Sequence, residues 1–233
     1  FDNILSNKCL VKLREMIKRR LAHEPFQHII GTGNFYGREY IVNSNVLIPR
    51  PETELIIEKL KLYGQTKTLL DVGTGTGCLA ITSCLEKLAN NIVAIDISQD
   101  AIQIAKQNAK LLNANNINFI LHNFLNNIFN IKFDVIISNP PYLDNNKIKD
   151  LDLEVKNFDP HIALTDYSDG LSFYRRFADQ FNNLLKDGGK LLLEFAGSYQ
   201  KKELIKIFHA HRNNLYFHKD LNGEDRVLEI INE

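Results

Sequence analysis

LLDVGTGTG, the sequence of residues 69–77, places a run of apolar residues directly before three closely spaced glycines. We predict a strand over residues 68–72, then a glycine loop, then a helix over residues 77–88. Glycine in such a loop permits positive φ angles and lets the backbone approach a ligand closely. A strand, a loop and a helix in this order predict the ligand-binding edge of an α/β sheet.

The glycine spacing and a neighbouring acid indicate which ligand the loop takes. The spacing is G-x-G-x-G, whereas dinucleotide-binding folds use G-x-G-x-x-G. Asp71 lies at the end of the strand, and a pyrophosphate prefers a helix N-terminus without a carboxylate beside it. A carboxylate suits a cationic ligand better, and S-adenosylmethionine carries both an ammonium and a sulfonium group. We therefore predict an S-adenosylmethionine site and disfavour a nicotinamide oxidoreductase.

Outward from this unit, apolar segments that resemble buried strands alternate with helical segments. Such alternation predicts a parallel sheet with helices on both faces. The other predicted helices cover residues 98–112, 171–185 and 199–209, and Asp187-Gly188-Gly189 ends the second of them. Seven strands are predicted, over residues 68–72, 91–97, 117–122, 133–137, 190–194, 215–218 and 226–231.

The first 46 residues do not follow this alternation. Residues 1–30 are charged and carry apolar residues at helical spacing. The basic residues of this helix form either a solvated face or a surface that docks a partner. Residues 31–46 place aromatic and β-branched residues around Gly37, which predicts a β-hairpin linker. The main domain then covers residues 47–233.

A rigid loop holds Arg50 just before the main domain. The prolines on either side fix the backbone φ angle near about −65°. Thr53 or Glu52 then starts a helix that ends near Lys61. Arg50 forms either a surface salt bridge or part of a site, and the sequence leaves both open.

Two more predicted strands end in side chains that suit a nucleoside. Asp96 ends the second strand, where a carboxylate can accept hydrogen bonds from both ribose hydroxyls. After the third strand, Asn123 can hydrogen-bond the edge of an adenine. Phe124 either packs on that adenine or belongs to the core.

The fourth strand runs into SNPPY, residues 138–142. Each proline lacks a backbone N–H and has a fixed φ, so we predict a stiff elbow, either a plain turn or a binding site. The Asn139 side-chain oxygen and the Pro140 carbonyl can accept both N–H bonds of a planar amide or arylamine. Tyr142 adds an aromatic ring, and the nitrogen lone pair is left to face an electrophile.

Composition argues against several classes of protein. The 233 residues contain 28 Lys+Arg and 28 Asp+Glu, so zero net charge gives no electrostatic footprint for nucleic acid. The sequence has no apolar run near the ~18 residues that indicate a membrane span. Its three cysteines are odd in number and lack metal-like spacing, which predicts a reduced, cytoplasmic setting and no metal.

The glycine loop, Asp96 and the SNPPY elbow together resemble class I methyltransferases that act on planar amino groups. LIPRPETE at residues 47–54 narrows the resemblance to the release-factor glutamine methyltransferase family, also called PrmC or HemK. Further agreement comes from EV at 154–155, DP at 159–160, AL at 163–164, DGL at 169–171 and DLNGEDRV at 220–227. The resemblance covers roughly residues 20–233 and implies a Rossmann-like fold.

By this resemblance, the enzyme would methylate the side-chain amide of the glutamine in the Gly-Gly-Gln motif of class 1 peptide chain release factors. S-adenosylmethionine would become S-adenosylhomocysteine. The implied catalytic residues are Asn139, Pro140 and Tyr142, and the implied substrate-binding residues are Asn139, Pro140, Pro141, Tyr142 and Arg50. The implied cofactor-binding residues are Asp71, Gly73, Thr74, Gly75, Thr76, Gly77, Asp96, Ile97, Asn123, Phe124 and Asn139.

The chain departs from the family pattern at three places. Asn123 stands where relatives usually carry an acid, and Phe195 where a histidine is common. Residues 1–30 are shorter than the family's N-terminal helical domain, and we expect a remnant of that docking domain. Some family members are fused to a tRNA methyltransferase domain, and the sequence leaves this open.

No formal base is expected in the reaction. Hydrogen bonds to Asn139 and Pro140 would polarise and aim the amide nitrogen. Two alternatives change the acceptor: a glutamine of a ribosomal protein, or the exocyclic amine of an adenine stacked on Tyr142. Zero net charge disfavours the nucleic acid. The intact elbow disfavours a third alternative, a non-catalytic module that binds S-adenosylmethionine.

Overall fold

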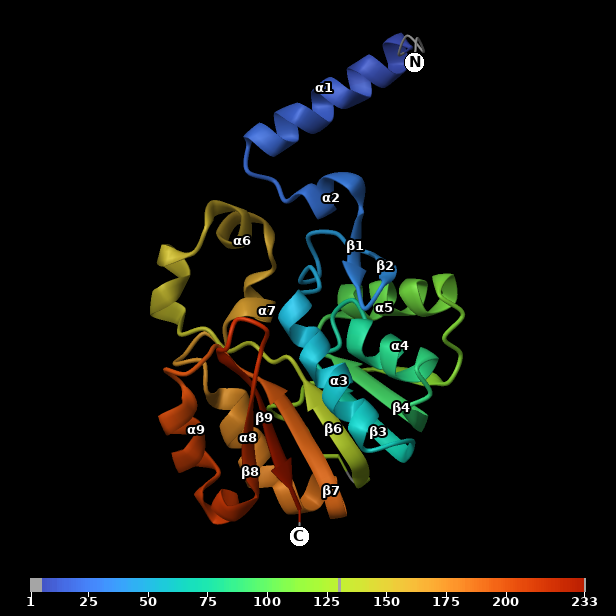
Figure 1. Cartoon of the computed structure of the whole chain (residues 1–233). Helices are drawn as coiled ribbons and strands as arrows, with labels where there is room; N and C mark the ends of the chain where they lie inside the picture. The colour runs from blue at the N-terminus through green and yellow to red at the C-terminus, as the bar shows by residue number, and fades with distance from the viewer. Residues whose placement is uncertain (1–5, 130, 233) are drawn as a thin grey trace.

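The computed structural model describes residues 6–129 and 131–232. Its central feature is a seven-stranded sheet with the strand order β5-β4-β3-β6-β7-β9-β8 (Figure 1). The first five strands in this order are parallel, and β9 is antiparallel to both β7 and β8. This confirms the predicted mostly parallel sheet, whose strands are β3 (Thr66–Val72), β4 (Ala89–Asp96), β5 (Ile117–Leu121), β6 (Phe133–Ser138), β7 (Leu185–Glu194), β8 (Leu215–Lys219) and β9 (Asp225–Ile231).

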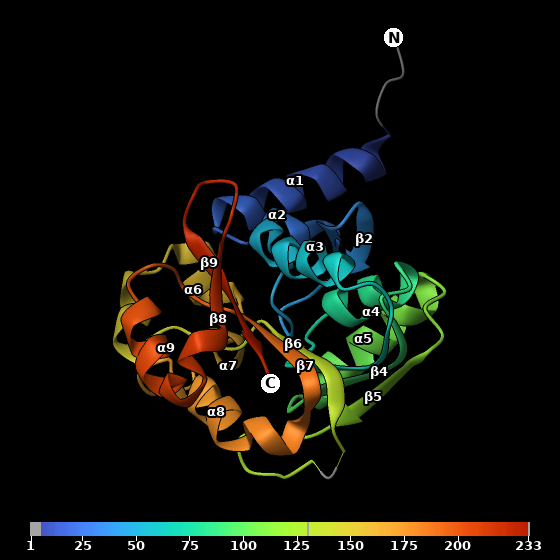
Figure 2. The ribbon, with the colours of Figure 1, turned by 60° about the horizontal axis from the view of Figure 1, so that its bottom comes forward.

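Helices cover both faces of the sheet, as Figure 2 shows. Leu69 of β3 belongs to the core on one face, and the next residue, Leu70, belongs to the core on the other. Because successive side chains of a strand point to opposite faces, a strand buried on both sides is continuously apolar. On the first face lie α3 (Glu54–Leu62), α4 (Cys78–Leu85) and α5 (Gln99–Leu111); on the second lie α8 (Ser172–Leu184) and α9 (Lys201–Ile207).

The N-terminal part consists of two helices and a hairpin: α1 (Asn7–Leu21), α2 (Phe26–Ile30), β1 (Thr32–Phe35) and β2 (Arg38–Ile41). In Figure 1, α1 extends away from the rest of the molecule, and none of its residues is buried. Tyr36 and Gly37 form the hairpin turn with positive φ angles, as two-residue hairpin turns require. The predicted helical segment and hairpin are confirmed.

The two largest errors in the predicted boundaries lie at the end of α4 and at the start of β7. The helix predicted over residues 77–88 ends at Leu85, because Lys87 takes a φ of 56° in the turn into β4. Residues 187–189 do not end a helix, because β7 starts at Leu185 and pairs there with Phe133. An irregular register between β6 and β7 accommodates the extra residues.

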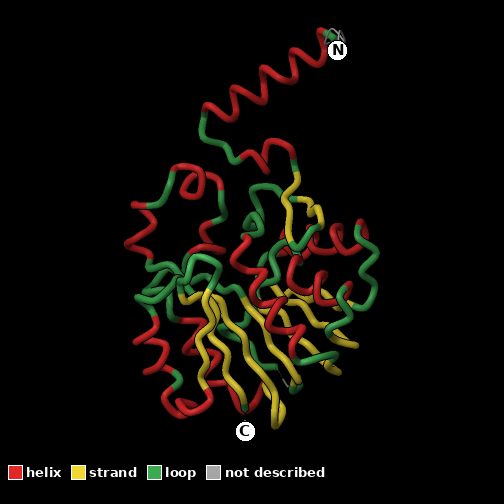
Figure 3. The backbone as a smooth tube through the Cα atoms, viewed as in Figure 1, coloured by secondary structure: helices red, strands yellow, loops and turns green. Residues whose placement is uncertain are grey.

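Short helices that were not predicted lie between β6 and α8 in the chain. Figures 1 and 3 show them at the end of the sheet to which the parallel strands point, on the same side as the hairpin. They therefore wall the edge at which the ligand site was predicted. These helices are η2 (Asn145–Asp150), α6 (Leu153–Phe158) and α7 (His161–Leu164); η1 (Pro51–Thr53) precedes α3, and η3 (His209–Asn214) follows α9, which is shorter than predicted.

Candidate functional site

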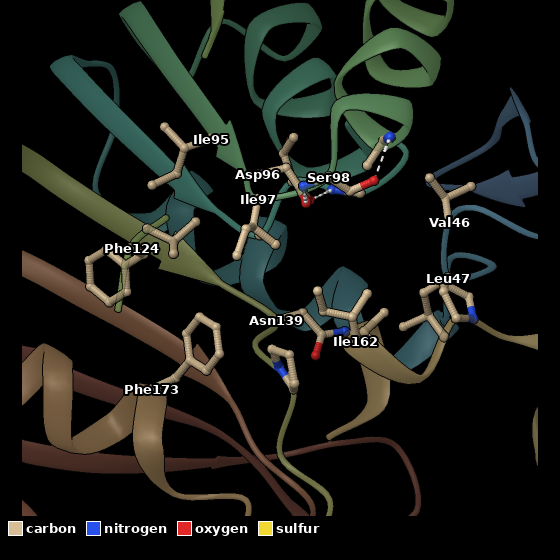
Figure 4. A pocket seen from close by; sticks show the side chains of 18 of the residues that line it. Val46, Leu47, Ile95, Asp96, Ile97, Ser98, Phe124, Asn139, Ile162 and Phe173 are labelled. Carbon is tan, nitrogen blue, oxygen red and sulfur yellow. Dashed lines mark hydrogen bonds between the residues drawn. The ribbon is translucent and has the colours of Figure 1, made fainter. Parts of the chain in front are cut away.

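A cavity of about 300 Å³ lies at the carboxyl ends of β3, β4 and β6. Figure 4 shows Asp96 on one side of this cavity, Leu47 on another and Asn139 on a third. We name it the cofactor cavity after the ligand predicted for the glycine loop. The structure thus brings together segments that lie far apart in the sequence. The predicted site residues in the cavity wall are Arg50, Gly73, Thr74, Gly75, Thr76, Asp96, Ile97, Asn123, Phe124, Asn139 and Pro141.

The other predicted site residues are Asp71, Gly77, Pro140 and Tyr142, and they lie outside this wall. Gly77 shows why a residue behind the wall can still be required. Its φ is +82°, and a side-chain carbon there would lie 2.8 Å from Ile81 Cδ1 and 3.1 Å from Ala105 Cβ. Only glycine satisfies both the positive φ and the close contact between α4 and α5.

Asp71 supports the glycine loop from beneath. Its side chain is fully buried, and Oδ2 accepts a hydrogen bond from Thr74 Oγ1 at 2.7 Å. Burial raises the pKa of Asp71 to about 7, although the Thr74 hydroxyl acts to lower it. The backbone N–H groups of Gly73 and Thr74 both donate to the Ile95 carbonyl at 2.9 Å. Support of the loop is what the structure shows for Asp71, and its contact with a ligand stays a prediction.

Asp96 joins the glycine loop to the start of α5. Its Oδ2 accepts from the backbone N–H of Gly75 at 2.9 Å, and Oδ1 accepts from that of Ser98 at 2.9 Å. Burial raises the pKa of Asp96, while both backbone N–H groups act to lower it. Each carboxylate oxygen has a second lone pair, so Asp96 can still accept two hydroxyl groups from the cavity.

Asn123 and Phe124 form the wall beyond β5. Asn123 Oδ1 accepts from the backbone N–H of Leu125 at 3.1 Å, so this side-chain oxygen already stabilises its own turn. Phe124 is only 5% exposed and stacks with Phe173, the ring centroids being 6.2 Å apart. Phe124 is therefore a core residue that also lines the cavity, and its packing on an adenine stays a prediction.

The Asn139 elbow is held by side chains as well as by its prolines. Strand β6 ends at Ser138, whose hydroxyl donates to the Val72 carbonyl at 2.6 Å. Asn139 Nδ2 donates to Thr53 Oγ1 at 3.0 Å. Thr53 in turn donates to Glu194 Oε2 at 2.6 Å. The orientation of the Asn139 amide is therefore fixed by η1 and β7.

Glu194 is a site residue that the sequence analysis missed. It is 1% exposed at the end of β7, and its Oε1 accepts from the Tyr142 hydroxyl at 3.4 Å. Burial raises the pKa of Glu194 to about 7, while the Thr53 hydroxyl and Arg226 act to lower it. Burial also raises the pKa of Tyr142. An acid at the carboxyl end of an apolar strand was the signal available, whereas Thr53 was considered only as a helix start.

A second cavity, of about 270 Å³, lies on the Tyr142 side of the elbow. Asn139 lines both cavities and so stands between them. Tyr142 contributes an aromatic ring to this cavity, which we name the substrate cavity after the ligand predicted for the elbow. Its charged residues are Arg50, Glu52, Glu194 and Arg226.

Arg50 forms an ion pair with Asp159, with 2.7 Å between Arg50 Nη2 and Asp159 Oδ2. The Asp159 side chain is fully buried. Burial raises the pKa of Asp159 to about 6, while Arg50 acts to lower it. The pair ties the loop before α3 to the chain between α6 and α7. Arg50 lines both cavities, and its contact with a substrate stays a prediction.

Gly170 lies directly against the elbow. Its φ is +76°, and a side-chain carbon there would lie 2.3 Å from the Tyr142 carbonyl oxygen. The Gly170 N–H donates to Asp166 Oδ1 at 2.9 Å. The backbone that leads into α8 therefore packs against the backbone that leaves the elbow.

Metal clusters and membrane helices are absent from the described residues. Within residues 6–129 and 131–232, no group of three His, Cys, Asp or Glu side chains could hold a metal ion. The helices in this part of the chain are too short or too polar to cross a membrane.

Two protein families match the chain. The Methyltransferase small domain matches residues 51–155, which include the glycine loop and the elbow. The PrmC N-terminal domain matches residues 1–31. The hairpin and the Arg50 loop lie between the two matched segments.

Curated relatives cover most of this chain. The bifunctional methyltransferase of Rickettsia prowazekii is 38% identical over 97% of this chain and 48% of its own length. The release factor glutamine methyltransferase of Bacillus subtilis is 37% identical over 94% of this chain and 79% of its own length. The release factor glutamine methyltransferase of Enterococcus faecalis is 36% identical over 93% of this chain and 79% of its own length. The chain thus spans about half the length of the Rickettsia relative and most of the other two.

Solved structures share the fold at low sequence identity. A methyltransferase from Pyrococcus furiosus has a TM-score of 0.61 and 14% identity, covering 95% of this chain and 98% of its own. A ribosomal protein L11 methylase from Lactobacillus delbrueckii has a TM-score of 0.54 and 20% identity, covering 80% and 79%. These similarities confirm the predicted Rossmann-like methyltransferase fold.

Proposed function

Because this chain belongs to the release factor glutamine methyltransferase family, we propose that it methylates the side-chain amide nitrogen of a glutamine with S-adenosylmethionine. The proposed substrate is the Gly-Gly-Gln motif of class 1 peptide chain release factors, in the cytoplasm, and S-adenosylhomocysteine is the second product. One observation carries the proposal: Asn139 lines both cavities. A cofactor on one side and a glutamine side chain on the other would meet at this residue.

The residues of the cofactor cavity fit S-adenosylmethionine. Asp96 has a lone pair on each oxygen for the ribose hydroxyls, and Phe124 with Phe173 offers aromatic surface for the adenine. The glycine loop and Ile97 complete the proposed cofactor site. When bound, the cofactor supplies a methyl group that is already electrophilic because it is attached to a sulfonium.

Asn139 and Pro140 are proposed to orient the substrate amide. Since Thr53 engages the Asn139 Nδ2, Asn139 Oδ1 is left to accept one amide N–H, and the Pro140 carbonyl is the proposed acceptor of the other. Two acceptors fix the plane of the amide and aim its nitrogen at the cofactor cavity. Such positioning can lower a barrier by up to ~7–11 kcal/mol. We assign no side chain as a base, so the proton leaves the nitrogen after transfer.

The substrate cavity is proposed to receive the glutamine side chain. Tyr142 would pack against its methylene groups within this cavity, and Pro141 would do so from the cofactor cavity. Arg50, which lines both cavities, would contact the adjoining backbone. We assign residues 1–30 to release factor docking because residues 1–31 match the PrmC N-terminal domain. Residues 31–46 would link this segment to the methyltransferase domain, residues 47–233.

Transfer of labelled methyl groups tests the proposal. The chain is incubated with labelled S-adenosylmethionine and a purified class 1 release factor, beside the same factor with Gly-Gly-Gln changed to Gly-Gly-Ala. We expect label in the first factor and none in the second. Equal label in both would place the reaction at another residue. No label, with S-adenosylhomocysteine still bound, would contradict the proposed substrate and point to a ribosomal protein or an adenine.

A further inference from the structure

A chain of hydrogen bonds runs from the Asn139 amide to a buried carboxylate. Asn139 Nδ2 donates to Thr53 Oγ1 at 3.0 Å, and Thr53 Oγ1 donates to Glu194 Oε2 at 2.6 Å. Thr53 is 2% exposed and Glu194 1% exposed. Water therefore has little access to either partner, and the hydrogen bonds of these groups must be made within the protein.

Counting protons fixes the direction of this chain. The Thr53 hydroxyl has a single proton, and an ionised Glu194 can only accept. Thr53 must therefore donate to Glu194 and accept from its other neighbour. That neighbour, the Asn139 amide, has to present its Nδ2 to Thr53, which turns Oδ1 away from Thr53.

We infer that the Glu194 carboxylate, acting through Thr53, selects which atom of Asn139 faces the substrate amide. This inference rests on the proposed function, because a substrate –NH2 group is a double donor and needs two acceptors. The Pro140 carbonyl can only accept. The Asn139 side chain can present either a donor or an acceptor, so its orientation decides whether the site matches the substrate.

Protonation of Glu194 reverses the direction of both hydrogen bonds in this series. A protonated Glu194 donates to Thr53, whose own proton is then free to point at Asn139. The amide turns over to accept that proton and presents Nδ2 to the substrate. Two donors then face each other, and the substrate nitrogen loses its orientation.

The groups around Glu194 come from several elements. Tyr142 and Arg226 line the same cavity, and Glu52 stands beside Thr53. The Tyr174 hydroxyl on α8 donates to the backbone carbonyl of Glu194 at 2.7 Å. Cys78 at the start of α4 is also near enough for the charge of Glu194 to act to raise its pKa. Burial raises the pKa of Glu194 to about 7, Arg226 and the Thr53 hydroxyl act to lower it, and Glu52 acts to raise it. The ionised, acceptor-only form of Glu194 therefore gains population as the pH rises through neutrality.

Substitutions at Thr53 test the inference. Thr53→Val removes the hydroxyl but keeps the shape, Thr53→Ser keeps the hydroxyl, and Thr82→Val removes another buried hydroxyl, one bonded to Tyr40 at 2.9 Å. We expect kcat for release factor methylation to fall about 10- to 100-fold in Thr53→Val and to stay within about threefold in the other two. Binding of S-adenosylhomocysteine should stay within about threefold in all three.

The pH profile separates positioning from packing. In the unaltered chain, kcat should rise with pH and level off above about pH 7. In Thr53→Val this rise should disappear, because the carboxylate no longer reaches Asn139. Unaltered kcat and an unaltered pH profile in Thr53→Val would overturn the inference and leave the proposed function standing. Equal losses in Thr53→Val and Thr53→Ser would also overturn it.

NMR spectroscopy reads the amide orientation without any turnover. The Asn139 side-chain NH2 signals, assigned by their loss in Asn139→Asp, should include one proton that is shifted downfield at pH 8 and returns to the ordinary position in Thr53→Val. Signals that are identical in the two proteins would overturn the inference. Absence of methyl transfer by the unaltered chain would instead count against the proposed function, so the two failures are distinguishable.

Discussion

The ends of β3 and β6 are neighbours in the sheet, yet they are stiffened by different means. The β3 loop depends on positive φ angles at its glycines and on the buried Asp71 beneath it. The β6 elbow depends on prolines and on hydrogen bonds that reach Thr53 and Glu194. Changes in the loop should therefore damage folding and cofactor binding. Changes in the elbow should damage turnover while the fold persists.

The largest expected effect is a pH-dependent change in stability at Asp71. Its folded pKa of about 7 lies above the ordinary value of 3.8. The stabilisation is complete below the unfolded pKa and is lost as the pH rises through the folded pKa. Three pKa units correspond to about 4 kcal/mol. The difference in unfolding free energy between the unaltered chain and Asp71→Asn should fall by this amount between pH 4 and pH 8.

Urea unfolding at a series of pH values measures this difference. Asp100→Asn, an exposed carboxylate in the first turn of α5, is the control. A difference that is constant with pH would show that the Asp71 carboxylate is not perturbed by burial.

Gly77→Ala should have the next largest effect, a loss of about 3 kcal/mol of unfolding free energy. A positive φ costs a non-glycine residue roughly 1–2 kcal/mol, and the contacts at 2.8 Å and 3.1 Å add overpacking. Gly64→Ala is the matched control, because Gly64 has a φ of +70° and open space at the added carbon. Urea unfolding should show about 1 kcal/mol for Gly64→Ala. Equal losses of unfolding free energy in Gly77→Ala and Gly64→Ala would mean that the close contact between α4 and α5 adds nothing to the cost of the substitution.

Asn139→Ala tests the elbow. We expect kcat for release factor methylation to fall about 100-fold, or ~3 kcal/mol, because one of the two acceptors for the substrate amide is removed. The unfolding free energy should change by less than about 1 kcal/mol, since Asn139 is only half-buried. Asn115→Ala, an exposed asparagine in the loop after α5, serves as the control. Near-normal turnover in Asn139→Ala would contradict the proposed role of this residue.

The smallest expected effect is on cofactor affinity at Asp96. Asp96→Asn replaces one of two acceptor oxygens by an NH2 group that faces a backbone N–H. Loss of one charge-assisted hydrogen bond, about 1.5–3 kcal/mol, should weaken binding of S-adenosylhomocysteine roughly 10- to 100-fold. Isothermal titration calorimetry measures the affinity. Unchanged affinity would remove Asp96 from the cofactor site.

Local sequence was sufficient for the parts of the fold that depend on local rules. The glycine loop, the hairpin turn at Gly37 and the proline elbow were predicted because φ preferences act within a few residues. The seven strands followed from their apolar runs. The helix end predicted at Gly188 and Gly189 was wrong, because the irregular pairing of β6 with β7 places both glycines inside a strand.

The polar network behind the elbow could not be predicted in the same way. Thr53 and Glu194 are 141 residues apart, and their pairing requires η1 to lie across the end of β7. The sequence left open whether Arg50 forms a salt bridge or part of a site, and its partner Asp159 lies in a segment of short helices without a clear period. Long-range partners of buried polar groups follow from the packed fold and not from spacing.

Gly170 carries a consequence for how this protein can change over generations. Its backbone packs against the Tyr142 carbonyl, and any side-chain carbon there would lie 2.3 Å from that oxygen. Every codon one nucleotide away from a glycine codon that still encodes another amino acid introduces such a carbon. Any single amino-acid substitution at position 170 therefore forces the backbone of the elbow to move, although this residue lines neither cavity. Steric contact alone thus restricts position 170 to glycine.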